Sequence, residues 1–206
     1  MKYQKLSPEF YLREDVKAIA RDLIGKVLVT TYEGVRTSGI ITETEAYEGE
    51  TDQASHAFGG RNTPRTSIMY REGGIAYIYL CYGIHSLFNV VTNQEGRPHA
   101  VLIRALYPLE GQDAMQSRNA RIDPPWKMAF GPGKLSKAMG IHFSETGISL
   151  MGERLWIEDR GYRIPESLVL SGKRIGVAYA AEHADWPNRY FIKANKLELS
   201  GLVISG

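Results

Sequence analysis

The 206-residue sequence has one cysteine, Cys81, and no long apolar stretch. One cysteine excludes an internal disulfide and any cysteine-rich zinc or iron–sulfur site. No run approaches the ~18 apolar residues that a membrane-spanning helix needs, and the first residues, 1–5, lack the apolar core of a signal peptide. We therefore expect a cytoplasmic protein without a membrane partner.

A large excess of either charge is also absent. Lys and Arg number 25 against 23 Asp and Glu, a formal net charge of +2, and 43% of residues are hydrophobic. This composition excludes a disordered or low-complexity chain. The length fits a single domain over residues 1–206.

Charge is nevertheless unevenly distributed along the chain. Residues 55–104 carry five arginines against two glutamates, whereas residues 43–52 carry five acidic side chains. This pattern fits a surface for a polyanion beside a carboxylate site. Uneven surface charge without function is the alternative.

Periodicity predicts an α+β domain on a curved, mostly antiparallel sheet. A helix is expected from Ser7-Pro8-Glu9 to Gly25, another opens at Pro108-Leu109-Glu110, and a further one follows Gly131-Pro132-Gly133-Lys134 and is closed by Gly140. Residues 51–71 are expected to form a long loop, and loops of this length are usually functional or disordered. Expected strands cover residues 26–32, 35–47, 75–82, 86–92, 99–107, 149–158, 173–178 and 189–193. Because helices and strands do not alternate regularly, a doubly wound parallel sheet is disfavoured.

Two glutamates interrupt the strand expected over residues 35–47. On a regular strand Ile41, Glu43, Glu45 and Tyr47 share one face. A carboxylate beside aromatic rings loses solvation, which raises its pKa and makes it a usable general base. The alternative is a strand end that emerges into solvent.

The next candidates lie in the long loop and in the tyrosine-rich strand that follows it. His56 is a lone loop histidine without HxxxH or HExxH spacing, so we expect no metal site. Tyr82, directly before Gly83, is expected at a hairpin tip, where an aromatic side chain can wedge between stacked bases. Half-buried packing of the tyrosines is the alternative.

The segment Gly131-Pro132-Gly133-Lys134 is similar to a P-loop but does not match the pattern. Met128 and Leu135 stand where glycine and Ser or Thr are required. A glycine turn that feeds a helix can still hold one phosphate through backbone N–H groups. An ordinary helix start is the alternative.

Taken together and in order, several motifs resemble those of the alkyladenine (N-methylpurine, 3-methyladenine) DNA glycosylases. The resemblance runs from about residue 10 to residue 191. The matching segments are 43–47, 54–56, 59–65, 69, 77–79, 82–83, 89, 102–106, 108–111, 131–135 and 174–177.

The resemblance implies a role for each matched residue. Glu45 corresponds to the general base, which positions the attacking water together with Arg104 and the backbone carbonyl of Ile175. Tyr47, His56 and Tyr79 correspond to the rings that sandwich the flipped base, with His56 also a donor to it. Asn89 corresponds to the residue that excludes guanine, and Tyr82 to the one that fills the gap in the duplex. Contacts to the DNA backbone or pocket rim are implied for Arg61, Thr63, Ile84, His85 and Lys134.

Two positions qualify the resemblance. Glu43 matches the motif but receives no role, and His85 stands where mammalian relatives have an aromatic residue. The implied protein is a monomeric, monofunctional glycosylase of damaged double-stranded DNA with a protruding, intercalating β-hairpin. It needs no metal or cofactor, has no lyase activity, and would associate with the nucleoid in a bacterium. Alternatives are a non-catalytic nucleic-acid-binding module and a sugar O-glycoside hydrolase that uses Glu43 and Glu45.

Overall fold

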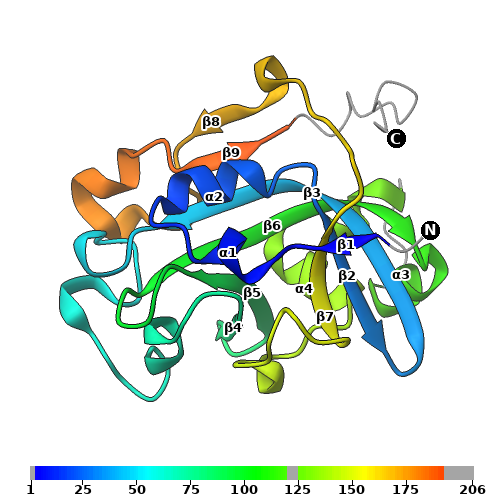
Figure 1. Cartoon of the computed structure of the whole chain (residues 1–206), viewed down its shortest axis with the longest axis horizontal. Coiled ribbons are helices and arrows are strands. Elements are labelled where there is room, and N and C mark those ends of the chain that lie inside the picture. Colours follow the sequence, from blue (N-terminus) through cyan, green and yellow to red (C-terminus); the bar gives the residue numbers. More distant parts are fainter. Residues whose placement is uncertain (1–2, 120–124, 193–206) are drawn as a thin grey trace.

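The computed structural model describes residues 3–119 and 125–192, and a long antiparallel sheet lies at its centre (Figure 1). The sheet curls into a half-barrel with strand order β1-β7-β2-β3-β6-β5-β4; β9 pairs with β3, and β8 with β9. The strands are β1 (Gln4–Lys5), β2 (Val27–Tyr32), β3 (Val35–Tyr47), β4 (Ala76–Cys81), β5 (His85–Thr92), β6 (His99–Glu110), β7 (Leu155–Asp159), β8 (Leu170–Gly172) and β9 (Arg189–Phe191). This agrees with the expected α+β class.

The helices are short. They are α1 (Pro8–Tyr11), α2 (Val16–Asp22), α3 (Gln112–Asn119) and α4 (Pro132–Ala138). The 3-10 turns are η1 (Gly49–Thr51), η2 (Phe58–Gly60), η3 (Ser67–Tyr70), η4 (Pro125–Ala129), η5 (Phe143–Glu145), η6 (Glu166–Leu168) and η7 (Ala178–Asp185). No helix in the described ranges is long and apolar enough to cross a membrane.

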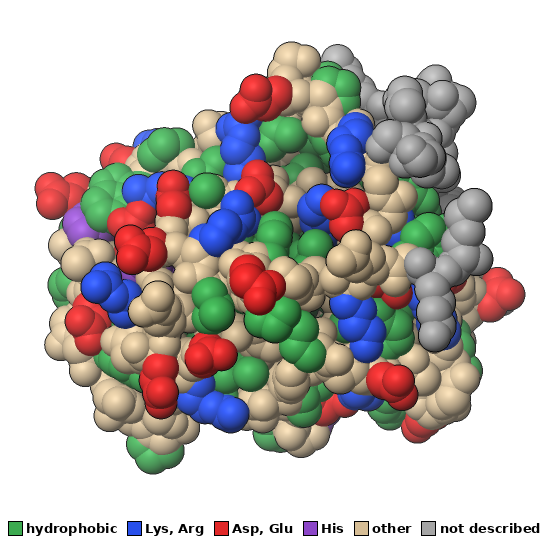
Figure 2. Space-filling view, viewed as in Figure 1, with side chains coloured by type: hydrophobic (Ala, Val, Ile, Leu, Met, Phe, Trp, Pro, Cys, Tyr) green, Lys and Arg blue, Asp and Glu red, His purple; other side chains and the backbone are tan. Residues whose placement is uncertain are grey.

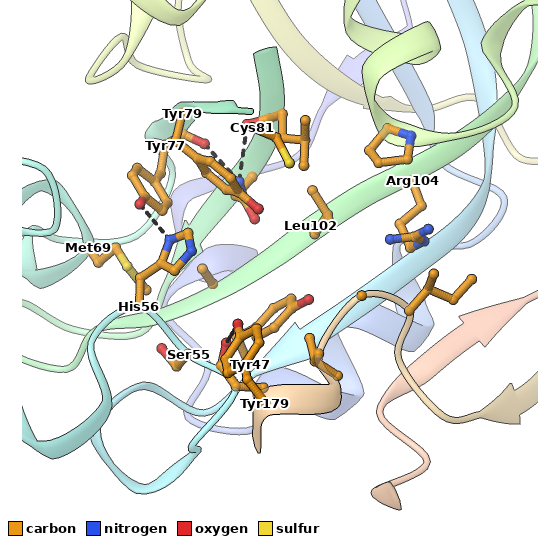
Figure 3. Close-up of a pocket in the computed structure, with 18 of the residues that line it drawn as sticks. Tyr47, Ser55, His56, Met69, Tyr77, Tyr79, Cys81, Leu102, Arg104 and Tyr179 are labelled. Carbon is orange, nitrogen blue, oxygen red and sulfur yellow. Dashed lines mark hydrogen bonds between the residues drawn. The ribbon is translucent and has the colours of Figure 1, made fainter. Parts of the chain in front are cut away.

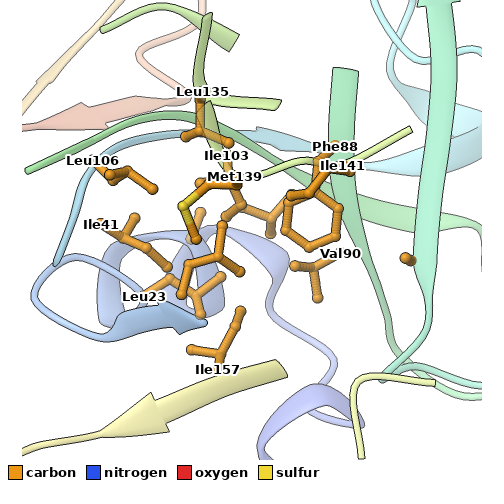
Figure 4. Packing of buried hydrophobic residues seen from close by; sticks show 14 of the residues in the cluster. Leu23, Ile41, Phe88, Val90, Ile103, Leu106, Leu135, Met139, Ile141 and Ile157 are labelled. Carbon is orange, nitrogen blue, oxygen red and sulfur yellow. The ribbon is translucent and has the colours of Figure 1, made fainter. Parts of the chain in front are cut away.

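Most of the apolar core lies between one face of the sheet and the helices. α2 packs on β3 and β6, and α4 packs on β5 and β6. Figure 4 shows Leu23, Ile41, Phe88, Ile103 and Met139 interdigitating in this core. The helices thus cover the core face, and the opposite face of β3 and β6 is left for the site.

β3 and β6 each carry one extra residue, and these two bulges lie close together. Beyond them, the side chains of both strands alternate in the opposite sense. The register with β6 passes from Ile41↔Leu106 to Glu43↔Ala105 and then to Thr44↔Ile103. Thr42 is the extra residue on β3, and Arg104 is the extra residue on β6. Such bulges are over-represented next to active sites.

The expectation that Ile41 shares a face with Glu43, Glu45 and Tyr47 is therefore wrong. Ile41 and Ala46 both lie in the main core, although they are an odd number of residues apart. The extra residue at Thr42 reverses the alternation, so that Glu43, Glu45 and Tyr47 point away from that core.

Several expected boundaries need correction. The first helix is two helices, because Asp15 caps a new start by accepting from the N–H groups of Lys17 and Ala18. No helix opens at Pro108: β6 continues to Glu110, and Pro108 sits beside a register shift, where its missing N–H costs no ladder bond. The long loop expected over 51–71 is confirmed, and the short turns η2 and η3 lie within it.

The late strands are shorter than expected. The 149–158 strand begins only at Leu155, and the strand expected over 173–178 lies at Leu170–Gly172 instead. Lys173–Val177 form a loop, and η7 follows. The last strand, expected over 189–193, ends at Phe191, and residue 193 lies outside the described residues.

The surface on the α2 side of the molecule has no field of a single sign. In Figure 2, blue and red side chains are interspersed over this face. We therefore do not expect this face to hold a polyanion, since non-specific binding to phosphates needs clustered cations.

Candidate active site

Glu45 lies buried on β3 with both carboxylate oxygens occupied. Oε1 accepts from the backbone N–H of Ile175 at 2.8 Å, and Oε2 accepts from the Tyr47 hydroxyl at 2.8 Å. Arg104 Nη1 lies 3.4 Å from Oε2, and the Glu45 side chain is 0% exposed. The structure thus brings Glu45, Arg104 and Ile175 together, but through the amide of Ile175 where the resemblance implied its carbonyl.

Burial dominates the acidity of Glu45. Desolvation raises its pKa above the ordinary value, although Arg104, the Ile175 N–H and the Tyr47 hydroxyl each act to lower it. The nearby charge of Glu43 adds to the rise. A carboxyl group with a raised pKa can take a proton more readily, as a general base requires.

Glu43 has a partner that the sequence did not indicate. Its Oε1 accepts from Arg104 Nε at 3.1 Å and from Arg189 Nη1 at 3.1 Å. Arg104 therefore bridges the two carboxylates of β3. Its guanidinium is a fork that can serve both at once.

A cavity of about 220 Å³ lies beside this cluster (Figure 3). Tyr77 and Tyr79 lie on one side of it and Tyr47 and Tyr179 on the other, with Leu102 between them. The volume is below the ~300–1,000 Å³ of drug-sized ligand sites. A cavity of this volume can hold one aromatic ring system.

The His56 ring is fixed inside the cavity. Nδ1 hydrogen-bonds the Tyr77 hydroxyl at 2.8 Å, and the ring meets Tyr79 edge-on at 4.6 Å between centroids. Burial, followed by the charges of Arg65 and Arg61, lowers the pKa of His56 to about 4. His56 is thus neutral at pH 7, with one ring nitrogen able to donate and the other to accept.

Asn89 lines the same cavity from β5. Its Nδ2 donates to the carbonyls of Tyr77 and Leu87, at 3.1 and 3.2 Å. These bonds, one to β4 and one within β5, fix the amide group rigidly. A rigid side chain can discriminate between ring substituents by shape.

The β4–β5 hairpin brings Tyr82 to the mouth of the cavity. Tyr82 and Gly83 have φ of 52° and 73°, and Ile84 N–H closes the turn on Cys81 O at 3.2 Å. Tyr82 is 91% and Ile84 73% exposed. A bulky residue in the left-handed region is strained, so an exposed tyrosine here suggests a role other than packing.

The start of α4 supports this hairpin. His85 approaches the backbone of Gly133 so closely that a Cβ on Gly133 would lie 3.1 Å from the imidazole ring. Pro132 lines the cavity, and Lys134 is exposed on the same first turn of α4. The hairpin tip and the Gly131–Lys134 segment are therefore neighbours.

A buried ion pair holds the loop that carries Ile175. Arg174 Nη2 donates to Asp52 Oδ1 at 2.9 Å, and Nη1 donates to Ala46 O at 2.9 Å. The guanidinium also lies 4.8 Å from the centre of the Tyr47 ring. Arg174 thus connects the loop that carries Ile175 to Asp52, at the start of the long loop, and to Tyr47, in the aromatic wall of the cavity.

Several candidate residues do not line the cavity. Arg61 and Thr63 are exposed, which leaves the expected contact with a DNA backbone open, and Thr63 also bonds Thr66 within a turn. Glu45 does not line it either, because Tyr47, Arg104 and Ile175 stand between. In the described ranges, no group of three or more His, Cys, Asp or Glu is placed to hold a metal ion.

Sequence reasoning missed three residues of the site. Arg174 was inside a matched motif, which was the available signal, but Tyr179 and Arg189 were in no motif. Tyr179 is 67% exposed at the cavity, and its hydroxyl donates to Ala54 O at 3.1 Å. A single exposed tyrosine in a turn carries no sequence signal.

Comparison with known proteins adds independent findings. The family model described as "Methylpurine-DNA glycosylase (MPG)" matches residues 9–196. Relatives named "Putative 3-methyladenine DNA glycosylase" are similar over most of the chain. The Chlamydia abortus protein is 45% identical over 188 residues (91% of this chain, 97% of the relative). The Chlamydia pneumoniae protein is 45% identical over 201 residues (97% and 100%), and that of Desulfitobacterium hafniense 41% over 198 residues (92% and 96%).

Proposed function

The chain belongs to the methylpurine-DNA glycosylase family, and on that premise, which makes it a DNA glycosylase of DNA repair, we propose its substrate and mechanism. It takes an alkylated or deaminated purine of the 3-methyladenine type out of duplex DNA into the aromatic cavity. It then hydrolyses the N-glycosidic bond and leaves an abasic site.

One observation carries this proposal: a buried carboxylate with a raised pKa directly behind an aromatic cavity of ring size. As the glycosidic bond breaks, positive charge develops on the sugar. The carboxylate of Glu45 stabilises that charge and takes a proton from the attacking water. The water oxygen bonds to the anomeric carbon, and the base leaves with the electrons of the C–N bond.

The cavity walls favour electron-poor purines. Tyr47 and Tyr79 present electron-rich rings, which attract a cationic methylated purine by cation–π interaction. Base–aromatic stacking contributes ~1–3 kcal/mol per contact, enough to offset the few kcal/mol of unstacking that flipping costs. Neutral His56 supplies a hydrogen-bond donor without repelling a cation.

Water reaches Glu45 only after a rearrangement. The Tyr47 hydroxyl covers Oε2 in the free protein. We propose that a base stacking on Tyr47 turns this ring, releases Oε2 and leaves room for one water between Glu45 and Arg104. Binding of the lesion thus exposes the catalytic base.

Tyr82 serves as the wedge that fills the vacated stack. Its 91% exposure and left-handed backbone support this role. Ile84 and His85 flank it at the hairpin tip, and Lys134 is close enough on α4 to meet a phosphate.

The side chains that line the cavity support hydrolysis in a single step. The residues that line the cavity, all of them within the described ranges, include no lysine that could form a Schiff base. We therefore propose a monofunctional enzyme without lyase activity. The rival O-glycoside hydrolase receives no support from the geometry, because Glu43 and Glu45 bind one arginine instead of flanking an open cleft.

The deciding experiment uses duplexes that each carry one defined lesion. Incubated with the protein without metal, lesions of the 3-methyladenine type should yield free base and an alkali-labile abasic site. Undamaged duplexes are the control. Binding of the lesion without base release would favour the non-catalytic binding module.

A further inference from the structure

A ring of contacts connects Glu45 to Arg189, a residue on a strand 144 positions further along the chain. Arg104 bridges Glu45 and Glu43, and Glu43 accepts from Arg189 Nη1 at 3.1 Å. Arg189 Nε donates to Lys173 O at 2.8 Å, two residues before the Ile175 amide that binds Glu45 at 2.8 Å. The contacts thus run from Glu45 to Arg104, Glu43, Arg189 and the carbonyl of Lys173. They close at the Ile175 amide, which binds Glu45 again.

We propose, on the basis of the proposed function, that Glu43 and Arg189 form a positioning pair that sets both donors of the catalytic carboxylate. Glu43 holds Arg104 by the Nε side of its guanidinium, which leaves Nη1 toward Glu45. Arg189 holds the carbonyl of Lys173 and with it the loop that presents Ile175. Neither residue lines the cavity.

The burial of the pair supports this role. The side chains of Glu43, Arg104 and Arg189 are 11%, 10% and 22% exposed. Taking these charges out of water costs free energy that a surface ion pair would not incur. The backbone register adds a constraint, because Arg189 lies directly opposite both Glu45 and Gly172.

Charge gives the pair a measurable effect on Glu45. The groups that face Glu45 are Arg104 from β6, Glu43 and Tyr47 from β3, the Ile175 amide and Arg174 from the loop, and Tyr179 from η7. Glu43→Gln removes a negative charge and leaves Arg104 to Glu45, so Glu45 should titrate at lower pH. Arg189→Gln leaves Glu43 to compete for Arg104, so Glu45 should titrate at higher pH.

The first measurement follows the Glu45 carboxyl by ¹³C NMR in the free protein, assigned with Glu45→Gln. We expect opposite shifts for the two variants and partial cancellation in the double variant. The matched control is Glu158→Gln, a buried carboxylate on β7 that binds Arg160 at 2.8 Å. Shifts no larger than in this control would overturn the proposal, whether or not the protein releases bases.

The second measurement separates charge from geometry. Arg189→Lys keeps the charge, but an ammonium cannot reproduce the fork that reaches both Glu43 and Lys173. We expect Glu45 to titrate as in the wild type, while single-turnover base release slows about tenfold, within the ~10² that a misplacement of about 1 Å can cost. Lesion-DNA affinity and thermal unfolding should stay close to wild type. An unchanged rate of base release would show that Arg189 acts by charge alone, which would contradict the proposal. If the wild type itself released no base, the proposed function would fail. The titrations of Glu45 would then still show whether Glu43 and Arg189 act as a positioning pair.

Discussion

Glu45 combines two requirements that conflict in an ordinary side chain: it is buried, and the mechanism we propose requires it to ionise. An unpaired buried carboxylate would be strongly disfavoured. Here the Ile175 amide and the Tyr47 hydroxyl donate charge-assisted hydrogen bonds to Glu45, and Arg104 adds an ion pair. Charge-assisted hydrogen bonds are roughly twice as strong as neutral ones. The Glu45 carboxyl group can therefore still ionise, although burial raises its pKa.

Replacing Glu45 by Gln keeps the side chain's shape but removes its charge and proton affinity. We expect lesion DNA to bind nearly as well, while base release slows at least ~10²-fold, the low end of what a positioned general base contributes. Wild-type activity should fall as the pH drops through the raised pKa of Glu45, and this acid limb should be missing in the variant. Substantial base release by Glu45→Gln would mean that another group is the base.

Tyr47→Phe tests the cover over Glu45. Phe keeps the stacking ring but loses the hydroxyl that lowers the pKa of Glu45, so that pKa should rise. The acid limb of kcat/KM, which reports the free enzyme, should move to higher pH. The acid limb of kcat should not move, because the hydroxyl has already left Glu45 in the complex. Equal shifts in both profiles would argue against displacement of Tyr47.

At the scale of elements, the hairpin and the paired bulges position the site. The bulges at Thr42 and Arg104 reverse the alternation of side chains along β3 and β6. Glu43, Glu45 and Arg104 therefore point away from the main core. The β4–β5 hairpin contributes cavity walls along its strands and carries Tyr82, the proposed wedge, at its tip. A two-stranded hairpin alone is marginal, but β6 and α4 pack against β5.

Tyr82→Gly should separate stability from function. Glycine adopts φ near 52° without the ~1–2 kcal/mol cost that other residues incur in the left-handed region, so the midpoint of thermal unfolding should rise. Base release from stable pairs should slow, and release from mispaired or single-stranded lesions should suffer less. The control is Gly83→Ala, which forces a side chain into φ 73° and should lower the unfolding midpoint. Equal losses on all substrates would indicate that Tyr82 does not act as a wedge.

At the scale of the whole molecule, the cavity combines segments that are far apart in the chain. β3, the loop at residues 54–56, the β4–β5 hairpin, β6 and residues 175–179 all contribute lining side chains. The net charge of +2 is small, and the α2 face is mixed in sign. We therefore expect binding to DNA to rely on cations elsewhere on the surface, such as the exposed Lys134 next to the β4–β5 hairpin.

The salt dependence of DNA binding tests how far the protein relies on these cations. The logarithm of non-specific affinity for DNA should fall linearly with the logarithm of salt concentration, by about 0.9 per phosphate neutralised. Lys134→Ala should make this slope shallower by about one and weaken binding to all sequences alike. Lys17→Ala, on α2, should leave the slope as in the wild type. An unchanged slope for Lys134→Ala would remove Lys134 from the DNA contact.

Local sequence was sufficient for many features. The glycines Gly34 and Gly83 mark two hairpin turns, because glycine adopts positive φ without a steric cost. The alternation of apolar residues defined most strands, and the ordered motifs led to the family. These features depend on neighbours along the chain, which a sequence records directly.

Only the tertiary structure decided the side of the sheet on which each residue lies and the partner that it meets. One extra residue at Thr42 reverses the alternation of β3, and no local signal marks it because Thr is an ordinary strand residue. Arg189 reaches Glu43 only because β9 pairs with β3, and Glu45 is hidden only because Tyr47, Arg104 and Ile175 converge on it. The motif singled out the carboxylate to which we assign catalysis. Its raised pKa, its shielding by Tyr47 and its contacts with Arg104 and Ile175 arise from burial and charge, which exist only once distant segments pack together.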